Sequence, residues 1–382
     1  DLYRDRYFSF PRAAIDLSRL EREVKVNADL YAQLKSKHQE LMIKSAEQIS
    51  EVTILEPAVA PHVAINAPNT LVNVVVGSLM GIFLGFVVAF MRESFDTSIA
   101  TIEGVEEFLK VPVLGVIPRF DEKEQLVIAA KELPPDISKE TLNVFAKLIT
   151  LYDPKSVLSE GFRSLRTNIQ FASTDRNIKS MLFTSAGLGE GKTTTVVNLA
   201  ITLAQDGKHV LLIDGDLRRP IIHHRFGLQR DPGLSEVLVG MPWRDAVRSV
   251  TDLILGTLGV DRVLQTPGLD NLSVLTSGAI PPNPSEFLSS PRLKEILAEM
   301  HEKFDIILLD TPPILPIGDA IQLANLADAA VIVYQVGRIS RNALKRAKFL
   351  LDHAQAKVLG LVLTDVRPEF TPEYTYYRYD YK

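Results

Sequence analysis

The chain has 382 residues, no cysteine and a formal net charge of −5. A chain of this length exceeds what one hydrophobic core usually fills, so we expect two or three folded units. The negative charge argues against a dominant nucleic-acid surface, and no nucleic-acid partner is expected. The lack of cysteine excludes disulfides, thiolate metal ligands and cysteine nucleophiles. The chain begins with Asp1 and has no charged leader before an apolar stretch, which indicates a fragment or a processed product.

Residues 1–70 are predicted to begin with a long helix. Apolar or seam residues recur there at alternating steps of three and four: Leu17, Leu20, Val24, Asn27, Tyr31, Leu34, His38 and Leu41. This stripe favours a coiled coil or a helical hairpin, and its polar members would set the register. An ordinary amphipathic helix packed on a domain remains the alternative. A short strand is then expected at Val52–Leu55, followed by a proline-rich extended segment with Pro57, Pro61 and Pro68.

Residues 71–91 are predicted to form a transmembrane helix. They carry no charge, and only an asparagine and a serine are polar. At about 1.5 Å per residue such a helix spans roughly 30 Å, the thickness of a bilayer core. A buried globular helix is the alternative, but apolar residues on every face argue against it. Gly77, Gly81 and Gly85 share one face, and both helix–helix packing and chance remain open as reasons for this spacing.

The part of the chain after this helix is expected to lie in the cytoplasm. No lysine or arginine occurs between Ser45 and Thr70, whereas Arg92 directly follows the apolar stretch. This asymmetry is the one that the positive-inside rule describes. Residues 92–155 are then predicted to form a cytoplasmic linker, with a short helix over 101–110, a strand over 111–118 and a charged, Pro134-Pro135-containing stretch over 121–155.

Residues 156–370 are predicted to form an α/β unit with a doubly wound parallel sheet. Apolar runs typical of buried strands alternate with helical patterns along this range. Strands are expected at Met181–Phe183, His209–Ile213, Leu272–Leu275, Ile306–Leu309, Ala330–Tyr334 and Val358–Thr364. Before the first of these strands, Glu160, Arg163 and Arg166 recur every third residue on a predicted helix. Solvated ion pairs of little energetic weight are the plain interpretation of this triplet.

A glycine-rich loop over Ser185–Thr194 predicts a nucleotide site. It follows the first expected strand and precedes a helical pattern over Thr195–Gln205. The glycines let successive backbone N–H groups turn onto phosphate oxygens, and the helix N-terminus adds its positive dipole end. Lys192 would reach the outer phosphates, and Thr193 would offer its hydroxyl to Mg²⁺. A glycine loop without a ligand is the alternative, but strand, loop and helix all fall where the mechanism needs them.

Two further strand ends supply carboxylates. The strand at His209–Ile213 runs into Asp214, Asp216 and two arginines. The strand at Ile306–Leu309 runs into Asp310-Thr-Pro-Pro. Open α/β sheets place their chemistry at the carboxyl ends of the strands. Asp310 is therefore interpreted as a Walker B carboxylate near Mg²⁺, which prefers oxygen ligands. A helix cap is the alternative for either segment taken alone.

The last residues, 371–382, are predicted to form a mobile tail. Five of the ten tyrosines fall within the last nine residues: Tyr374, Tyr376, Tyr377, Tyr379 and Tyr381. The flanking residues show no apolar periodicity, which favours an accessible segment. Phenols on a chain with a phosphoryl-donor site indicate that the tail accepts phosphate, and an aromatic adhesive tail is the alternative. Added phosphates would give the tail negative charge and favour its release.

These motifs resemble those of the bacterial tyrosine autokinases. The resemblance rests on the Gly-Glu-Gly-Lys-Thr loop, the Asp214-x-Asp216-x-Arg218 segment, the Asp310 segment, the Glu160-x-x-Arg163-x-x-Arg166 triplet and the tyrosine tail. Upstream, the heptad stretch and the proline-flanked apolar helix are similar to the chain-length-determinant module of polysaccharide co-polymerases. The resemblance covers nearly the whole chain. A co-polymerase would carry an earlier transmembrane helix, so the chain is interpreted as a C-terminal fragment.

The resemblance implies a role for each motif. ATP would be bound by Gly187, Leu188, Gly189, Glu190, Gly191, Lys192, Thr193 and Thr194. Mg²⁺ would be organised by Thr193, Asp214, Asp216 and Asp310. Lys192, Asp214 and Asp216 would be catalytic, with the choice of base between the two aspartates left open. Phosphoryl transfer needs mainly positioning and charge neutralisation, so these groups suffice. In the family the Glu160, Arg163 and Arg166 positions mediate subunit contact, and the tail enters a neighbouring site.

The implied setting is the bacterial inner membrane, with the kinase domain in the cytoplasm and residues 1–70 outside. The expected partners are further copies of the chain, the polysaccharide polymerase and export machinery, and a tyrosine phosphatase. A partitioning or positioning ATPase is one rival class, but such proteins carry a second lysine where this chain has Gly187. A non-catalytic, ATP-binding scaffold of the export complex is the other rival.

Overall fold

The computed structural model of the chain describes residues 2–47, 68–95, 102–119, 121–132, 139–174, 178–251 and 268–366. Two units are distinguished along the chain, Asp1–Phe86 and Val87–Lys382. Some sequence predictions lie outside the described residues: the strand at Val52–Leu55, Pro57, Pro61, the Pro134-Pro135 pair and the tail tyrosines.

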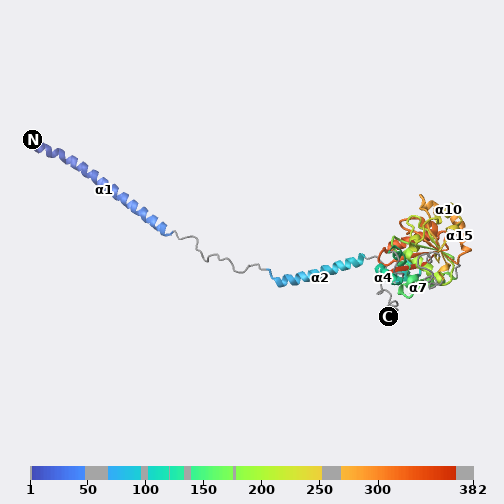
Figure 1. The fold of residues 1–382 in the computed structure, drawn as a ribbon. Coiled ribbons are helices and arrows are strands. Elements are labelled where there is room, and N and C mark those ends of the chain that lie inside the picture. Colours follow the sequence, from blue (N-terminus) through green and yellow to red (C-terminus); the bar gives the residue numbers. More distant parts are fainter. Residues whose placement is uncertain are drawn as a thin grey trace. The chain divides into compact units, whose positions relative to one another are not determined.

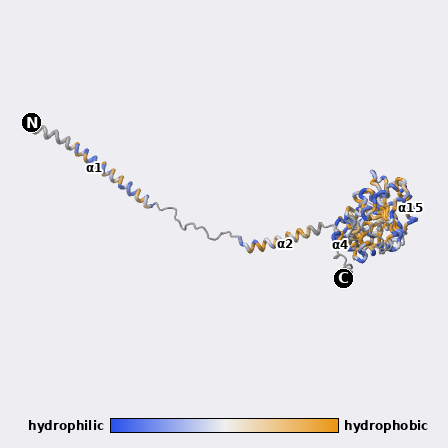
Figure 2. Tube along the Cα trace, viewed as in Figure 1, coloured by the Kyte–Doolittle hydropathy of each residue, from blue (hydrophilic) through white to orange (hydrophobic). Residues whose placement is uncertain are grey.

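The first unit begins with the helix α1 (Leu2–Glu47), which confirms the predicted helical segment. Residues of its stripe are exposed, and Leu17, Val24 and Leu34 each leave more than half of their surface accessible. Apolar and polar residues alternate along the described part of α1 (Figure 2). Pairing of this helix in a coiled coil stays a prediction.

The helix α2 (Thr70–Phe95) contains the predicted transmembrane segment. Its stretch Thr70–Met91 is long and apolar enough to cross a membrane, and the structure buries none of it. Figure 2 shows this apolar character along most of the helix. Leu71 and Phe86 leave 72% and 70% of their surface exposed. Exposed apolar surface costs about 25 cal/mol per Å² in water, so covering α2 with lipid or with another apolar surface would stabilise it.

The second unit is built on an eight-stranded sheet with the strand order β1-β8-β7-β2-β6-β3-β5-β4. The strands are β1 (Val113–Pro118), β2 (Ser180–Ser185), β3 (Val210–Asp214), β4 (Arg248–Ser249), β5 (Leu272–Leu275), β6 (Ile306–Asp310), β7 (Ala329–Gln335) and β8 (Val358–Val366). Every pair is parallel except β4 with β5. The predicted fold class is confirmed, and the six expected strands correspond to β2, β3, β5, β6, β7 and β8.

Helices cover both faces of this sheet (Figure 1). They are α3 (Ile102–Leu109), α4 (Glu122–Glu132), α5 (Lys139–Phe145), α6 (Ile149–Tyr152), α7 (Val157–Thr174), α8 (Lys192–Gln205), α9 (Ile222–Phe226), α10 (Leu234–Val239), α11 (Trp243–Ala246), α14 (Pro284–Leu288), α15 (Pro291–His301), α16 (Asp319–Ala324) and α17 (Arg341–His353), with a 3₁₀ turn η1 (Leu269–Asn271). Within β2, Met181 and Phe183 belong to the core beneath α4 to α9, whereas Leu182 belongs to the opposite core beneath α10 to α17. The two-residue period of a strand thus divides one apolar run between two cores.

The structure differs from the linker interpretation of residues 92–155. The strand β1 pairs with β8 at the edge of the sheet, and residues 121–155 contain α4, α5 and α6. Phe145, Ile149 and Tyr152 are each at most 2% exposed and belong to the core beneath α8. The charged residues between these apolar positions obscure any clear period in the sequence. Burial here depends on contact with a distant helix, which no local pattern reports.

The strand order places the carboxyl ends of β2, β6 and β3 side by side. β6 lies between β2 and β3, and the register pairs Phe183 with Asp310 and Asp310 with Asp214. The chain returns from β2 to β3 through α8, so the loop before α8 lies above this edge of the sheet. Crevices at such edges are where open α/β sheets bind ligands.

Candidate nucleotide site

The loop between β2 and α8 adopts the backbone that its glycines predict. Gly189 and Gly191 have φ angles of 75° and 87°, in the left-handed region that favours glycine. Gly191 immediately precedes α8, so the N-terminus of this buried helix opens onto the loop. A side chain on Gly189 would also approach Arg338 Nη2 to within 2.8 Å. The loop geometry therefore supports a phosphate-binding loop.

Lys192, Thr193 and Asp310 form one connected group. Lys192 Nζ donates to Asp310 Oδ1 over 3.0 Å, and Thr193 Oγ1 donates to Asp310 Oδ2 over 2.6 Å. The Lys192 side chain is 11% exposed and that of Asp310 is 1% exposed. Two residues from the start of α8 thus meet the carboxylate at the end of β6. The structure brings together the residues that the sequence places 117 and 118 positions apart.

Asp214 and Asp216 occupy different environments. Asp214 is fully buried, and its carboxylate accepts hydrogen bonds from the backbone N–H groups of Ile221, Ile222 and Asp216. Burial, with Asp310 nearby, raises the pKa of Asp214 well above its usual value. Asp216 lines a cavity at the loop, and burial raises its pKa as well. Asp214 therefore organises the backbone, whereas Asp216 faces the place where a ligand fits.

The loop that carries Asp216 is anchored through Arg218. Arg218 Nε donates to Asp319 Oδ2 over 2.7 Å, and Arg218 Nη2 donates to Ser285 Oγ over 2.9 Å. Ser285 Oγ in turn donates to Asp319 Oδ1 over 2.6 Å. The backbone N–H groups of Arg218 and Arg219 donate to Asp216 Oδ1. Arg218 thus fixes the segment that positions Asp216. Ser285 and Asp319 anchor Arg218, and no sequence motif indicated this role for them.

Glu190 braces the glycine loop against β7 and β8. Its Oε1 accepts a hydrogen bond from Gly187 N over 2.5 Å, and its Oε2 accepts one from Gln335 N over 3.2 Å. Thr364 Oγ1 donates to the Glu190 carbonyl over 2.8 Å. Because the side chain is 1% exposed, burial raises the pKa of Glu190 to about 7. Glu190 was expected among the ATP-binding residues, and its carboxylate additionally shapes the loop.

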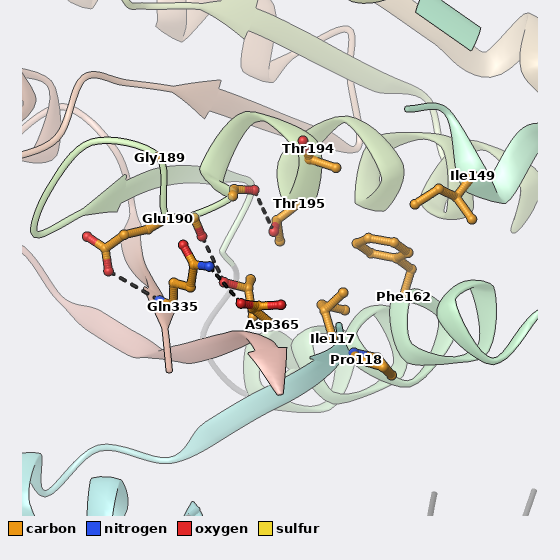
Figure 3. A pocket seen from close by; sticks show the side chains of 12 residues that line it. Ile117, Pro118, Ile149, Phe162, Gly189, Glu190, Thr194, Thr195, Gln335 and Asp365 are labelled. Carbon is orange, nitrogen blue, oxygen red and sulfur yellow. Dashed lines mark hydrogen bonds between the residues drawn. The ribbon is translucent and has the colours of Figure 1, made fainter. Parts of the chain in front are cut away.

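Two cavities meet at this loop. The first has a volume of about 350 Å³ and is lined by the loop residues 187–194 together with Ser185, Asp216, Arg219, Ile221, Arg225 and Pro313. We call it the phosphate cavity. The second has a volume of about 180 Å³ and is lined by Ile117, Pro118, Ile149, Phe162, Gly189, Glu190, Gly191, Thr194, Thr195, Gln335, Thr364 and Asp365. We call it the apolar cavity, and Figure 3 shows Phe162, Ile149 and Ile117 on one side and Glu190, Gln335 and Asp365 on the other.

The oxygen atoms around Asp310 suit Mg²⁺. The hydroxyl of Thr193 and the carboxylate of Asp310 already lie within 2.6 Å of each other. No group of three or more His, Cys, Asp or Glu side chains among the described residues could hold a metal by itself. Mg²⁺ commonly binds one or two protein oxygens and takes its other ligands from phosphate and water. The donor set therefore fits a magnesium ion that arrives with a nucleotide, rather than a metal cage built from protein alone.

The predicted interface triplet is partly used within the chain. Glu160 forms an ion pair with Arg163, one turn further along α7. Arg166 Nη1 instead donates to the Thr202 carbonyl on α8 over 3.1 Å and lies 3.5 Å from Asp206. The Glu160 and Arg163 side chains are 54% and 33% exposed, whereas that of Arg166 is 20% exposed. Glu160 and Arg163 remain accessible to a partner, and Arg166 ties α7 to α8.

These observations define a P-loop nucleotide-binding α/β domain. Comparison with known proteins supports the same class, since residues 182–357 match the model of an AAA domain. Residues 14–94 match the model described as "G-rich domain on putative tyrosine kinase". The second match covers the α1 region and α2.

The relatives identify the family more closely. The chain is 42% identical over 230 residues to the tyrosine-protein kinase YwqD of Bacillus subtilis, covering 60% of this chain and 90% of that protein. It is 32% identical over 348 residues to the tyrosine-protein kinase ptk of Acinetobacter johnsonii, covering 91% of this chain and 44% of that protein. The kinase domain of the Escherichia coli tyrosine kinase ETK matches with a TM-score of 0.58 and 25% identity, covering 69% of this chain and 93% of that one. The chimerical protein CapA2B2 matches with a TM-score of 0.57 and 32% identity, covering 70% and 100%.

The chain belongs to the bacterial tyrosine-protein kinases. It spans about half the length of the relatives that it matches over nearly its whole length, such as the kinase of Acinetobacter johnsonii and wzc of Salmonella typhimurium. The family membership confirms the resemblance that the motifs indicated, and it favours a kinase over the partitioning ATPases.

Proposed function

We propose that this protein is an ATP-dependent tyrosine autokinase that phosphorylates its own C-terminal tyrosine cluster, with transfer between subunits. The observation that carries the proposal is that Lys192, Thr193 and Asp216 line one cavity, while Lys192 and Thr193 both donate hydrogen bonds to Asp310. This arrangement would supply a cation for the phosphates, oxygen ligands for Mg²⁺ and a carboxylate that takes the proton of the acceptor tyrosine. The acceptor groups are Tyr374, Tyr376, Tyr377, Tyr379 and Tyr381.

The phosphate cavity would hold the triphosphate. Backbone N–H groups of the loop and the N-terminus of α8 would bind its oxygens, and Lys192 would turn from Asp310 to the outer phosphates. Mg²⁺ bound through Thr193 and Asp310 would neutralise charge that develops on the phosphates. Asp216 would accept the proton of the attacking tyrosine hydroxyl, because it reaches the cavity while Asp214 is committed to backbone N–H groups. Its raised pKa brings it closer to the range of an effective base.

The apolar cavity would take the nucleotide base. It adjoins the phosphate cavity, and the two share Gly189, Glu190, Gly191 and Thr194 in their walls. Ile117, Ile149 and Phe162 provide apolar surface for an aromatic ring (Figure 3). Gln335 and Asp365 provide polar groups at the opposite side, where Gln335 Nε2 donates to Asp365 Oδ2. An apolar cleft with a few placed polar groups is typical of a cofactor site.

The proposed setting is the bacterial inner membrane, with α2 as the transmembrane helix and the kinase domain in the cytoplasm. ATP is available on that side, and Arg92 follows the apolar stretch there. Residues 1–70 would then lie outside the cytoplasm. Because relatives include a kinase "in cps region" of Klebsiella pneumoniae, we propose that phosphorylation regulates the polymerisation and export of an extracellular or capsular polysaccharide. The proposed partners are further copies of the chain, the export machinery and a tyrosine phosphatase.

Incubation of the full chain in detergent with Mg·ATP tests the proposal. Phosphate should appear on tyrosines 374 to 381, as mapped by mass spectrometry of the tail. Label confined to residues outside this cluster would contradict the choice of acceptor. ATP binding without any transfer would favour a scaffold that binds nucleotide and performs no chemistry.

A further inference from the structure

Arg225 lies on α9, outside every motif that the sequence analysis used. Its side chain lines the phosphate cavity together with Lys192 and Arg219. The Arg225 Nε atom is buried and has no hydrogen-bond partner among the described residues. A buried N–H donor without a partner is costly, because it gives up its hydrogen bond to water and gains none in exchange. The structure thus holds a cation at the cavity with unused donor capacity.

Asp214 fixes the position of Arg225. The Asp214 carboxylate accepts hydrogen bonds from Ile221 N and Ile222 N, the first backbone groups of α9. Ile222 and Phe226 on the same short helix are at most 1% exposed in the core beneath. Hydrogen bonds to Asp214 hold the N-terminus of α9, and core packing holds its apolar face. Both contacts fix the backbone that places Arg225 at the cavity.

The charge balance of the site calls for more cations than Lys192. Asp310, Asp214 and Asp216 place three carboxyl groups near one another, and burial together with the charge of Asp310 raises the pKa of Asp214. A bound polyphosphate adds further negative charge to the same space. Arg225 lies close enough to Asp310 for that carboxylate to stabilise its charged form. Arg225 and Arg219 on the cavity wall would offset the negative charge that Lys192 and one metal ion do not neutralise.

We propose that Arg225 binds the phosphate chain of the nucleotide and, together with Lys192, neutralises it during phosphoryl transfer. This inference rests on the proposed function, since it assumes that the cavity takes ATP. The planar guanidinium suits the task because its N–H groups match phosphate oxygens two at a time.

A purely structural role is the competing explanation. Glu122 on α4 also stabilises the charge of Arg225, although its own hydrogen-bonded partner is Lys147. If Arg225 only helps to hold α4, removing Glu122 should have the same effect as removing Arg225. If Arg225 binds phosphate, the two changes should differ in nucleotide affinity. Glu122→Gln is therefore the matched control.

Calorimetric titration of the full chain in detergent with Mg·ADP and with a non-hydrolysable Mg·ATP analogue tests the proposal. Arg225→Met should raise the dissociation constant of the ATP analogue by about tenfold or more, the size expected for a charge-assisted hydrogen bond. Arg225→Lys should lose less affinity for the ATP analogue, because lysine keeps the positive charge but lacks the paired N–H donors of the guanidinium. Glu122→Gln should stay within about twofold of the parent. The ratio of the losses for ADP and for the ATP analogue shows which phosphate is bound, and a loss for either supports the inference.

Affinities of both Arg225 variants within about twofold of the parent would overturn the inference. So would equal losses in Arg225→Met and Glu122→Gln. Thermal unfolding without nucleotide identifies a variant that fails to fold. If Arg225→Met fails to fold, the affinity of Arg225→Lys is compared with that of the parent instead. A parent that binds nucleotide but labels no tyrosine contradicts the proposed function and leaves Arg225 as a phosphate ligand. A parent that labels its tail, with Arg225 variants that bind normally, contradicts only the inference.

Discussion

Lys192 Nζ contacts Asp310 Oδ1 at 3.0 Å, so the cation of the glycine loop is paired with the carboxylate that ends β6. Both side chains are shielded from water, and each compensates the charge of the other. Under the proposed function, nucleotide binding would exchange one partner for another, with Lys192 moving to phosphate and Asp310 turning to a metal ion.

Lys192→Met should abolish tail labelling. The variant would lose the cation for the outer phosphates and leave the buried Asp310 without its cationic partner, with only Thr193 still donating to it. A mixture of this variant with an active chain that lacks residues 371–382 separates two modes of transfer. Label on the Lys192→Met chain shows transfer between subunits, as we propose, and its absence would restrict transfer to a single chain. Radiolabel on separated bands measures both outcomes.

Thr193→Ala should raise the Mg²⁺ concentration needed for half-maximal labelling, by about tenfold. The change removes the hydroxyl that lies 2.6 Å from Asp310 Oδ2 and leaves the metal with fewer protein oxygens. Thr202→Ala is the matched control, because Thr202 lies on the same helix and donates only to the Leu199 carbonyl. A magnesium titration of both variants decides, and equal curves would argue against Thr193 as a ligand.

Asp214→Ala and Asp216→Ala should fail in different ways. Asp214→Ala leaves the N–H groups of Ile221 and Ile222 without their acceptor, which should lower the free energy of unfolding by about 1–3 kcal/mol. Asp216→Ala should unfold close to the parent, because Arg218 N and Arg219 N are exposed and can turn to water. It should nevertheless lose tyrosine transfer by about 100-fold or more while still binding nucleotide. Full transfer by Asp216→Ala would exclude it as the base.

Glu190→Gln should change how stability depends on pH. Burial raises the pKa of Glu190 from 4.5 to about 7 in the folded chain, so the folded state holds the proton more tightly than the unfolded state. Below the unfolded pKa this group has no effect, and stability falls as pH rises from there through about 7. Relative to the variant, the parent should lose on the order of 1–3 kcal/mol between about pH 5 and pH 8. Denaturant unfolding at several pH values measures the difference, and parallel curves would contradict the assignment.

Arg163→Ala and Arg166→Ala should be separable by size and stability. If α7 forms a subunit contact, Arg163→Ala should reduce the oligomer seen by light scattering with little change in unfolding. Arg166→Ala should instead lower stability, because it loses the Thr202 carbonyl and Asp206 on α8. An unchanged oligomer in the double variant would exclude the triplet as an interface.

Parts of this site were predictable because their patterns are local. A loop such as Ser185–Thr194 needs its glycines, lysine and threonine next to one another, since backbone N–H groups can surround phosphate only from consecutive residues. The strands that end in Asp214 and Asp310 are apolar runs bounded by polar residues, so their type and approximate limits follow from composition. The apolar stretch of α2 is equally local.

Other parts depend on contacts between distant segments. Arg225 carries no motif, and only the packing of α9 against the sheet brings it to the phosphate cavity. Ile117 and Phe162 lie far from the glycine loop in sequence but line the same apolar cavity as Gly191. The strand β1 lies in a segment predicted as a linker, but it pairs with β8 and its residues Ile117 and Pro118 line the apolar cavity.

The amino-acid sequence by itself determined the family, the fold class, the membrane-length helix and the identity of the loop and strand-end residues. It did so because each of these depends on residues that are adjacent or regularly spaced. Only the tertiary structure decided that Asp214 is committed to α9 while Asp216 faces the cavity, and that Arg166 is bound within the chain while Glu160 and Arg163 are accessible. Those distinctions arise from burial and from hydrogen-bond partners, which residues acquire when remote segments pack together.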